Sequence, residues 1–247
     1  MINSRGNIFS SLPPVTKNLV IINVLIWFAA FLFKNVGTFL VKFGALHYWE
    51  ASDFNAVQLF TYMFLHLDFS HVFFNMFSLF IFGHVLERVW GSKRFLFYYI
   101  STGIGAAIVH EIYWIFTIND GLSLVDSVTQ QISLTGADAL SYARAHGMDL
   151  TSYYNNNLAL GASGAVFGVL LAFGMMFPNV PMYIMFIPIP IKAKYMVIGY
   201  GALELLLGFG GLQQGVAHFA HLGGMLFGLI ILLVWKKKGI LGGGKYY

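Results

Sequence analysis

Residues 155–177 read NNNLALGASGAVFGVLLAFGMMF, and this stretch indicates what kind of chain it belongs to. Three asparagines give way abruptly to an apolar run that approaches the roughly 20 residues needed to cross a bilayer as a helix. Ser163 lies just inside this run, flanked by small residues: Gly161, Ala162 and Gly164. A hydroxyl without a bulky neighbour is unexpected in such a segment, and the rest of the sequence has to account for it.

The composition of the whole chain is that of a membrane protein. Of its 247 residues, 58% are hydrophobic and 10% are charged, whereas a soluble domain usually carries about 25% charged residues. Helices are the expected spanning elements, because lipid cannot satisfy exposed backbone groups. The absence of cysteine excludes disulfides and cysteine-ligated metals. The sequence therefore predicts an all-α polytopic membrane protein, and its net charge of +4 gives no indication of nucleic-acid binding.

Six apolar stretches are predicted to span the membrane. They lie at about 18–36, 70–89, 94–116, 158–177, 194–209 and 216–235. Lys and Arg concentrate on the cytoplasmic side of membrane proteins. If the N-terminus is cytoplasmic, eleven of the 14 Lys and Arg residues lie inside, and Lys34, Lys42 and Arg144 lie outside. Both termini are therefore predicted to be cytoplasmic.

This topology divides the chain into three parts. They are a cytoplasmic segment at 1–17, a six-helix membrane domain at 18–235 and a basic cytoplasmic tail at 236–247. The membrane domain includes a polar outer loop at about 118–157, in which Val125, Val128 and Ile132 recur at helical spacing and indicate a short helix. A cleaved signal peptide is the alternative for the first span, but no small-x-small cleavage site follows it.

Three of the predicted spans begin on the outer side and carry polar residues near that end. His71 and Asn75 lie in the second span and Ser163 in the fourth. His218 and His221 lie near the start of the sixth. With a rise of 1.5 Å per residue, all are within roughly 10 Å of the outer ends of their helices. Ionisable residues are costly inside a membrane, so this group is the candidate functional site.

The chemistry that fits this group is nucleophilic catalysis by a serine with a histidine as its base. Ser163 would attack a carbonyl, and His221 or His218 would take its proton and return it to the leaving amine. His71 and Asn75 share one helical face. They could donate hydrogen bonds to the developing oxyanion, while the small residues around the serine would let a substrate backbone approach.

The small residues also have a structural explanation. Gly164 and Gly168 in the fourth span, and Gly224 and Gly228 in the sixth, form small-xxx-small patterns that are typical of close helix packing. A serine in such a place is more often a packing residue, yet close packing of these two spans would itself bring it near the histidines. The motif is not the G-x-S-x-G nucleophile elbow, because Ala165 fills the last position and no strand is expected before it.

Metal binding and transport are the other interpretations. The histidines that could ligate a metal are His66, His71, His218 and His221, but no acidic residue sits convincingly among them. His110 and Glu111 begin an H-E-x-x-H pattern, in which Trp114 replaces the second histidine. Glu111 and Glu204 could belong to a proton path or be packed residues, and no internal duplication favours a transporter. The histidines expected in loops or at the interface are His47, His84 and His146.

Three segments resemble the signature sequences of the rhomboid intramembrane serine proteases. They are FLHLDFSHVFFNM (64–76), GASGAVFG (161–168) and AHFAHLGGMLFG (217–228), and LERVWGS (86–92) resembles the loop that follows the second span. The resemblance runs in order from about residue 57 to 235. It implies a six-helix bundle with a Ser/His dyad in a water-filled cavity that opens to the outside.

The resemblance also implies a role for individual residues. Ser163 would be the nucleophile and His221 the general base, while His71, Asn75 and the Ser163 backbone N–H would line the oxyanion hole. The supporting residues would be His66, Gly161, Gly164, Phe167, Gly224 and Gly228; of these, His66 would support the first loop and Phe167 would pack on the base. No catalytic role follows for His218. The outer loop is longer than in a minimal bacterial member, and it would either restrict or guide access or be an inert spacer.

The expected function is therefore cleavage of single-span membrane proteins near the outer face of the membrane. The enzyme would work in the lipid bilayer, and it would need no metal or organic cofactor. Substrates would reach the site between the second and fifth spans. The alternative is an inactive rhomboid-like protein that binds and retains membrane proteins, but such proteins typically lack the serine or the histidine, and both are present. The absence of an Arg-rich amphipathic N-terminus favours a bacterial inner membrane.

Overall fold

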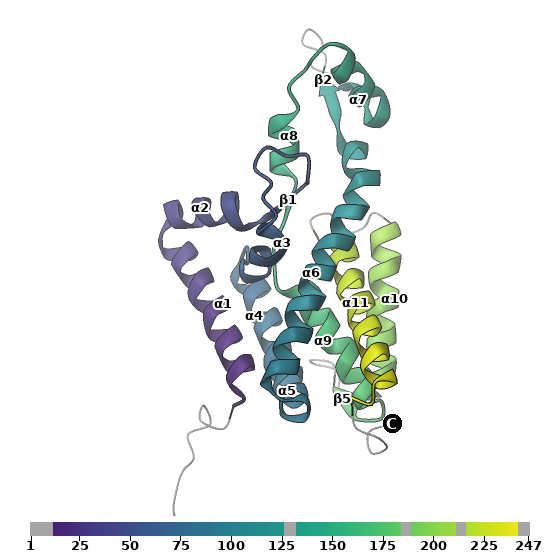
Figure 1. The fold of residues 1–247 in the computed structure, drawn as a ribbon. Coiled ribbons are helices and arrows are strands. Elements are labelled where there is room, and N and C mark those ends of the chain that lie inside the picture. The colour runs from purple at the N-terminus through teal and green to yellow at the C-terminus, as the bar shows by residue number, and fades with distance from the viewer. Residues whose placement is uncertain (1–11, 126–131, 184–188, 211–215, 242–247) are drawn as a thin grey trace, which may run out of the picture.

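A computed structural model describes residues 12–125, 132–183, 189–210 and 216–241 of the chain, and Figure 1 shows the arrangement. Long helices run side by side, and a smaller group of short elements rises above one end of them. The start of α1 and the end of α11 lie at the opposite end. Within the described residues the strands form three two-stranded antiparallel sheets.

The apolar stretches fold into helices close to their predicted positions. These helices are α1 (Pro14–Leu32), α4 (Phe69–Ser78), α5 (His84–Trp90), α6 (Ser92–Thr117), α9 (Ser163–Met176), α10 (Ala193–Phe209) and α11 (His218–Lys237). A π-helical turn, η3 (Leu79–Gly83), joins α4 to α5. Within the described residues, four helical segments are long and apolar enough to cross a membrane: Pro14–Leu32, Phe69–Trp90, Ser92–Gly121 and His218–Lys237. The apolar helix α9 is shorter, with 14 residues.

Two predicted boundaries differ from the structure. The first span was expected at about 18–36, but α1 ends at Leu32 because Phe33 is extended, and α2 (Lys34–Gly44) begins after it. The fourth span was expected from residue 158, but Leu158–Ala159 form strand β4 and pair with β1 (Leu46–His47). Helix α9 therefore begins only at Ser163.

The polar stretch between α6 and α9 is a small folded unit above the bundle (Figure 1), and we call it the outer unit after its predicted side of the membrane. Its elements are η4 (Ile118–Gly121), β2 (Ser123–Val125), β3 (Ile132–Thr135), α7 (Gly136–Ala145) and α8 (Thr151–Asn156). The helix expected around Val125 and Ile132 is wrong, because both residues lie in the antiparallel pair β2–β3; β-branched residues favour such strands. Val128 lies outside the described residues.

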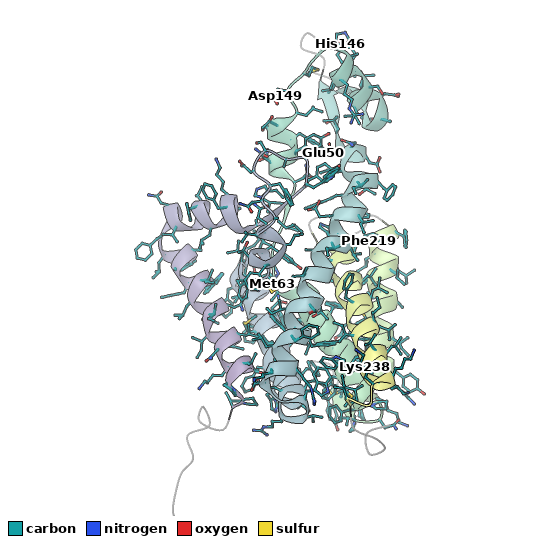
Figure 2. The ribbon with its side chains drawn as sticks, viewed as in Figure 1. Glu50, Met63, His146, Asp149, Phe219 and Lys238 are labelled. Carbon is teal, nitrogen blue, oxygen red and sulfur yellow. The ribbon has the colours of Figure 1, made fainter. Side chains whose placement is uncertain are left out.

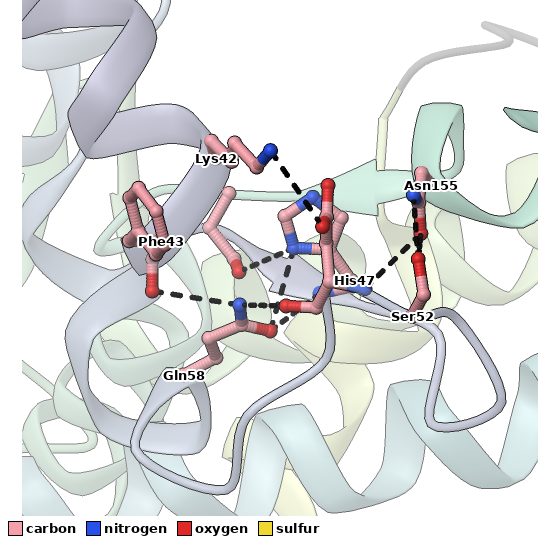
Figure 3. A network of polar contacts seen from close by, with 8 residues as sticks. Lys42, Phe43, His47, Ser52, Gln58 and Asn155 are labelled. Carbon is pink, nitrogen blue, oxygen red and sulfur yellow. Dashed lines mark hydrogen bonds and ion pairs between the residues drawn. The ribbon is translucent and has the colours of Figure 1, made fainter.

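The first loop, between α2 and α3 (Gln58–Thr61), is held by a network of polar contacts (Figure 3). Gln58, at the start of α3, accepts the backbone N–H of His47 at 3.2 Å and donates to the Asp53 carbonyl at 2.8 Å. Asn155 of α8 donates to Ser52 Oγ at 3.0 Å and accepts the Asp53 N–H at 3.2 Å. The network therefore ties the outer unit to the first loop. His47, expected in a loop or at the interface, is buried within it in strand β1.

Charged and polar side chains gather at the two ends of the molecule. Figure 2 shows Glu50, His146 and Asp149 at the end with the outer unit, and Lys238 at the other end. A hairpin of β5 (Pro181–Tyr183) and β6 (Pro190–Lys192) joins α9 to α10. The outward faces of the helices between the two ends carry many exposed apolar side chains, as expected for contact with lipid.

Helices α6, α9 and α11 pack closely in the centre of the bundle. Gly224 of α11 lies directly on the backbone carbonyl of Gly164 in α9, so that a Cβ at residue 224 would overlap the carbonyl oxygen. Gly168 faces Thr102 of α6, and Gly228 faces the hydroxyl of Tyr98. The small residues thus allow all three helices to approach, whereas the sequence pattern alone suggested only the pair α9 and α11.

Candidate active site

Ser163 is the first residue of α9 and follows a sharp change of chain direction. Strand β4 ends at Ala159, and Gly161 then adopts a φ of 129°, which favours glycine. A Cβ on Gly161 would also lie 2.6 Å from His71 Nε2. The expectation that no strand precedes the serine is wrong, because a two-residue strand does so. The chain therefore presents the hydroxyl at a strand–turn–helix junction, where the backbone N–H groups of the first helical turn have no partner within the helix.

His221 lies beside this serine, although 58 residues separate the two in the chain. Its Nε2 atom is 2.7 Å from Ser163 Oγ, which is the length of a good hydrogen bond. Phe167, one turn after the serine, stacks on the His221 ring with centroids 4.3 Å apart and planes 3° from parallel. The side chain of Phe167 therefore packs on His221 as the resemblance implied, and the imidazole is held between a hydroxyl and an aromatic face.

His71 and Asn75 approach the serine from α4. Asp68 caps this helix by accepting the His71 backbone N–H at 2.8 Å. The His71 ring reaches the backbone of Gly161, two residues before Ser163. Asn75 is buried, and its side-chain amide donates to the His71 carbonyl at 2.9 Å. The structure thus places His71 against the serine loop, while the Asn75 amide is hydrogen-bonded to the backbone of its own helix.

His66 contacts the same loop beside His71. Its Nε2 atom accepts the backbone N–H of Ala162 at 3.4 Å, and its ring lies 4.9 Å from the ring of His71. Burial, together with the neighbouring His71, lowers the pKa of His66 to about 3. The ring is therefore neutral at ordinary pH, and only the neutral ring can accept this hydrogen bond.

We expect His66 to make the protein sensitive to mild acid. The unfolded chain takes up a proton at this histidine near pH 6.5, whereas the folded chain does so only near pH 3, so stability falls as the pH drops between these values. A His66→Gln variant should lose less stability than the wild type between about pH 7 and pH 4. Thermal unfolding in detergent micelles measures the effect, with exposed His146→Gln as the control. The same pH dependence in His66→Gln and wild type would contradict it.

Glu204 also lies at this site, although it was not predicted to belong to it. It lies in α10, is 8% exposed, and places Oε2 2.6 Å from His218 Nδ1 and 3.0 Å from His221 Nδ1. The expectation that no acidic residue sits among the histidines is therefore wrong. The sequence does give one indication of a role for Glu204, because an ionisable residue inside an apolar span is energetically costly without a partner.

Glu204, His218 and His221 are also the described residues best placed to hold a metal ion. Each offers one ligand atom, and these atoms lie within 4.8 Å of one another. Two histidines and one carboxylate are a ligand set that Zn²⁺ accepts. The short His218–Glu204 contact gives these groups partners without an ion, and the absence of a metal requirement stays a prediction.

Glu111, His84 and His146 lie apart from the Ser163–His221 pair, whereas His110 lines the same cavity as the pair. His110 is buried, and its ring contacts Trp114 with centroids 4.2 Å apart. Glu111 accepts the backbone N–H of Trp49 at 3.1 Å. His84 hydrogen-bonds the Phe80 carbonyl at 2.6 Å, and His146 lies exposed in the outer unit. The structure brings none of these described residues into contact with the Ser163 hydroxyl.

A cavity of about 740 Å³ contains the site. Ser163, His71 and His221 line it, together with parts of α6 and α10. Tyr153 and Asn156 from the outer unit also contribute to its wall. The volume is in the range of ordinary ligand pockets, so the cavity can hold several residues of a peptide chain beside the serine.

Comparisons with known proteins identify the family. The family model described as Rhomboid domain matches residues 53–238, which is more than half of the chain. The chain is 27% identical over 232 residues to Rhomboid protease AarA of Providencia stuartii, covering 90% of this chain and 72% of that protein. It is 45% identical over 47 residues to YdcA of Bacillus subtilis (strain 168), a protein named provisionally as a rhomboid protease; that match covers 19% of this chain and 24% of YdcA. With the helical bundle described above, the match over residues 53–238 shows that this chain is an integral membrane protein of the rhomboid family.

Proposed function

We propose that the protein is an intramembrane serine endopeptidase that uses Ser163 and His221 to cleave single-span membrane proteins near the outer face of the membrane. The observation that carries the proposal is the 2.7 Å contact between Ser163 Oγ and His221 Nε2 at the wall of the cavity. Membership of the rhomboid family and the similarity to a named rhomboid protease support it. The chemistry requires no metal or organic cofactor.

The first half of the reaction follows from this geometry. His221 Nε2 accepts the proton of Ser163 Oγ as the oxygen attacks the scissile carbonyl, and the carbonyl oxygen becomes an oxyanion. The Ser163 backbone N–H and the His71 side chain then donate to that oxyanion, with Asn75 as a further donor. The imidazolium of His221 gives its proton to the leaving amine. The products of this half are an amine and an acyl ester on Ser163.

Water completes the reaction. With the amine gone, neutral His221 Nε2 takes a proton from a water molecule that attacks the ester carbonyl. The same donors bind the second oxyanion, and the proton returns to Ser163 Oγ as the carboxylic acid leaves. Both halves use one base and one oxyanion site, so the cavity must admit water as well as the peptide.

The proposed topology has six spans, formed by α1, by α4 with α5, and by α6, α9, α10 and α11, with both termini in the cytoplasm. The distribution of eleven of the 14 Lys and Arg residues on the cytoplasmic side supports it. In this arrangement residues 1–17 and 236–247 are cytoplasmic, 18–235 form the membrane domain, and the outer unit within 118–157 faces the opposite side. The proposed location is a bacterial inner membrane.

Reconstitution tests the proposal directly. The purified protein in liposomes is incubated with a single-span test protein, and the products are mapped by mass spectrometry. We expect cleavage near the outer end of the span, and covalent labelling of Ser163 by a fluorophosphonate. Absence of both cleavage and labelling in a folded protein would overturn the proposal. Binding of the test protein without cleavage would instead support the inactive, protein-retaining alternative.

We expect Asn75→Ala to lower kcat by about one to two orders of magnitude, because one donor to the oxyanion is lost. Asn23→Ala is the matched control. Asn23 is also a buried helical asparagine, and it donates to the carbonyl four residues earlier at 2.8 Å, as Asn75 does at 2.9 Å. Equal activity of the two folded variants would remove Asn75 from the oxyanion site.

The outer unit is expected to control access to the cavity. Replacing residues 122–150 with a short Gly/Ser linker keeps Tyr153 and Asn155, which anchor α8 to Ile118 and to the first loop. Because the replaced residues lie between Gly121 and Tyr153, which both line the cavity, their loss should change the relative kcat/KM values of several single-span substrates. Unchanged values for every substrate, in a variant with wild-type thermal stability, would show that the unit is an inert spacer.

A further inference from the structure

The His221 imidazole has a second polar neighbour behind the serine. Its Nε2 atom faces Ser163 Oγ, while Nδ1 on the other side of the ring lies 3.0 Å from Glu204 Oε2. Glu204 belongs to α10, so the three side chains come from three different helices. The carboxylate is 8% exposed, and so is His221. Buried charges in such a place are strongly destabilising unless they are paired.

Glu204 holds the two histidines of α11 through a single oxygen. His218 Nδ1 lies 2.6 Å from Oε2 and forms a hydrogen bond with it. The His218 and His221 rings are nearly perpendicular, with planes 86° apart, and both present Nδ1 to this oxygen. A link between α10 and α11 would need only the His218 contact. The second contact, with the histidine that faces Ser163, therefore calls for its own explanation.

The contact with His221 is electrostatic in character. The carboxylate oxygen is at ion-pair distance from Nδ1 but lies off the direction of an Nδ1–H bond, so the pair falls outside hydrogen-bond geometry. The other titratable groups around His221 are His71 of α4, His110 of α6 and His218 of its own helix. None of these can supply a negative charge. Glu204 is thus the acidic partner of His221 among the described residues.

We propose that Glu204 is a positioning residue that holds the proton of neutral His221 on Nδ1 and stabilises the imidazolium formed when Nε2 takes the proton of Ser163. The inference rests on the proposed function, which it extends from two residues to a Ser163–His221–Glu204 arrangement. A carboxylate that faces Nδ1 leaves Nε2 unprotonated, as a base for serine requires. Glu204 itself stays ionised throughout, and the proton moves only between Oγ, Nε2 and the leaving amine.

The test compares Glu204→Gln with Glu111→Gln in liposomes. The glutamine at 204 keeps the size of the side chain but removes the charge, and its amide can donate to Nδ1 and favour the wrong tautomer. In soluble serine proteases the corresponding change lowers kcat about 10⁴-fold. Because the contact here is not aligned, we expect kcat to fall by about 10- to 100-fold with KM unchanged. Glu111 is a carboxylate of α6 that contacts Trp49 and not the dyad, so its replacement should leave kcat near the wild-type value.

A spectroscopic measurement on the wild type does not depend on the folding of any variant. Nitrogen-15 shifts of labelled histidine, assigned with His221→Gln, report which ring nitrogen carries the proton. We expect the Nδ1–H tautomer for His221. The Nε2–H tautomer in the resting wild type would overturn the inference, and so would a wild-type kcat in folded Glu204→Gln.

The failures of the two proposals can be told apart. Wild-type cleavage that depends on Ser163 but is unaffected in Glu204→Gln would remove Glu204 and leave the protease intact. A loss of kcat matched by an equal loss in Glu111→Gln would show a general effect of carboxylates within the helices and would also remove Glu204. No cleavage and no fluorophosphonate labelling by the folded wild type would overturn both proposals.

Discussion

Replacing Ser163 by alanine should abolish cleavage of a single-span substrate while the protein remains folded. The substitution removes Oγ, the atom that lies 2.7 Å from His221 Nε2. The serine side chain does not cap α9, because this helix has no side-chain cap hydrogen bond, so its loss should cost little stability. The expected fall in kcat is about 10⁶-fold, the size found when a soluble serine protease loses its nucleophile. Mass spectrometry of the products in liposomes measures it.

His221→Ala should have an effect of similar size, because nucleophile and base act as one unit. The double variant should therefore be no less active than either single variant. Ser133→Ala and His146→Ala are the controls, since both residues are exposed in the outer unit. Cleavage that survives in both Ser163→Ala and His221→Ala would end the proposal, whatever the family of the chain.

The helices could be predicted from the sequence because their signal is local. An apolar run and its polar flanks locate a span to within a few residues, as for α10 and α11. The errors arise where distant segments decide the structure. Leu158 is apolar and continues the run of α9, yet it pairs with His47, which lies more than 100 residues earlier. No pattern within residues 158–177 reveals that partner.

The candidate site, like the fold, could be predicted only where the signal is local. Ser163, His71 and His221 were selected by their depth in the predicted spans, and the structure places them around one cavity. Glu204 was not selected, although it contacts His221, because a single acidic residue in an apolar span has no partner that the sequence can name. Its contacts depend on how α10 packs on α11. That packing is a property of the tertiary structure.

Gly224→Leu should disrupt the enzyme more broadly than any change to a single polar group. A Cβ at this position would overlap the backbone carbonyl oxygen of Gly164, and backbone cannot rotate away as a flexible side chain can. Helices α9 and α11 must then separate, at a cost of about 1–3 kcal/mol or more, and Ser163 moves away from His221.

The expected result of Gly224→Leu is loss of both cleavage and thermal stability, and Gly224→Ala should show the same effects in milder form. Gly199→Leu is the matched control, because Gly199 is also a helical glycine and a Cβ at this residue would meet no atom within 4 Å. It faces outward from α10, so a leucine there should meet open surroundings and leave activity unchanged. A fully active Gly224→Leu protein would mean that the distance between Ser163 and His221 does not depend on the contact of α9 with α11, and the structural basis proposed for the dyad would then be wrong.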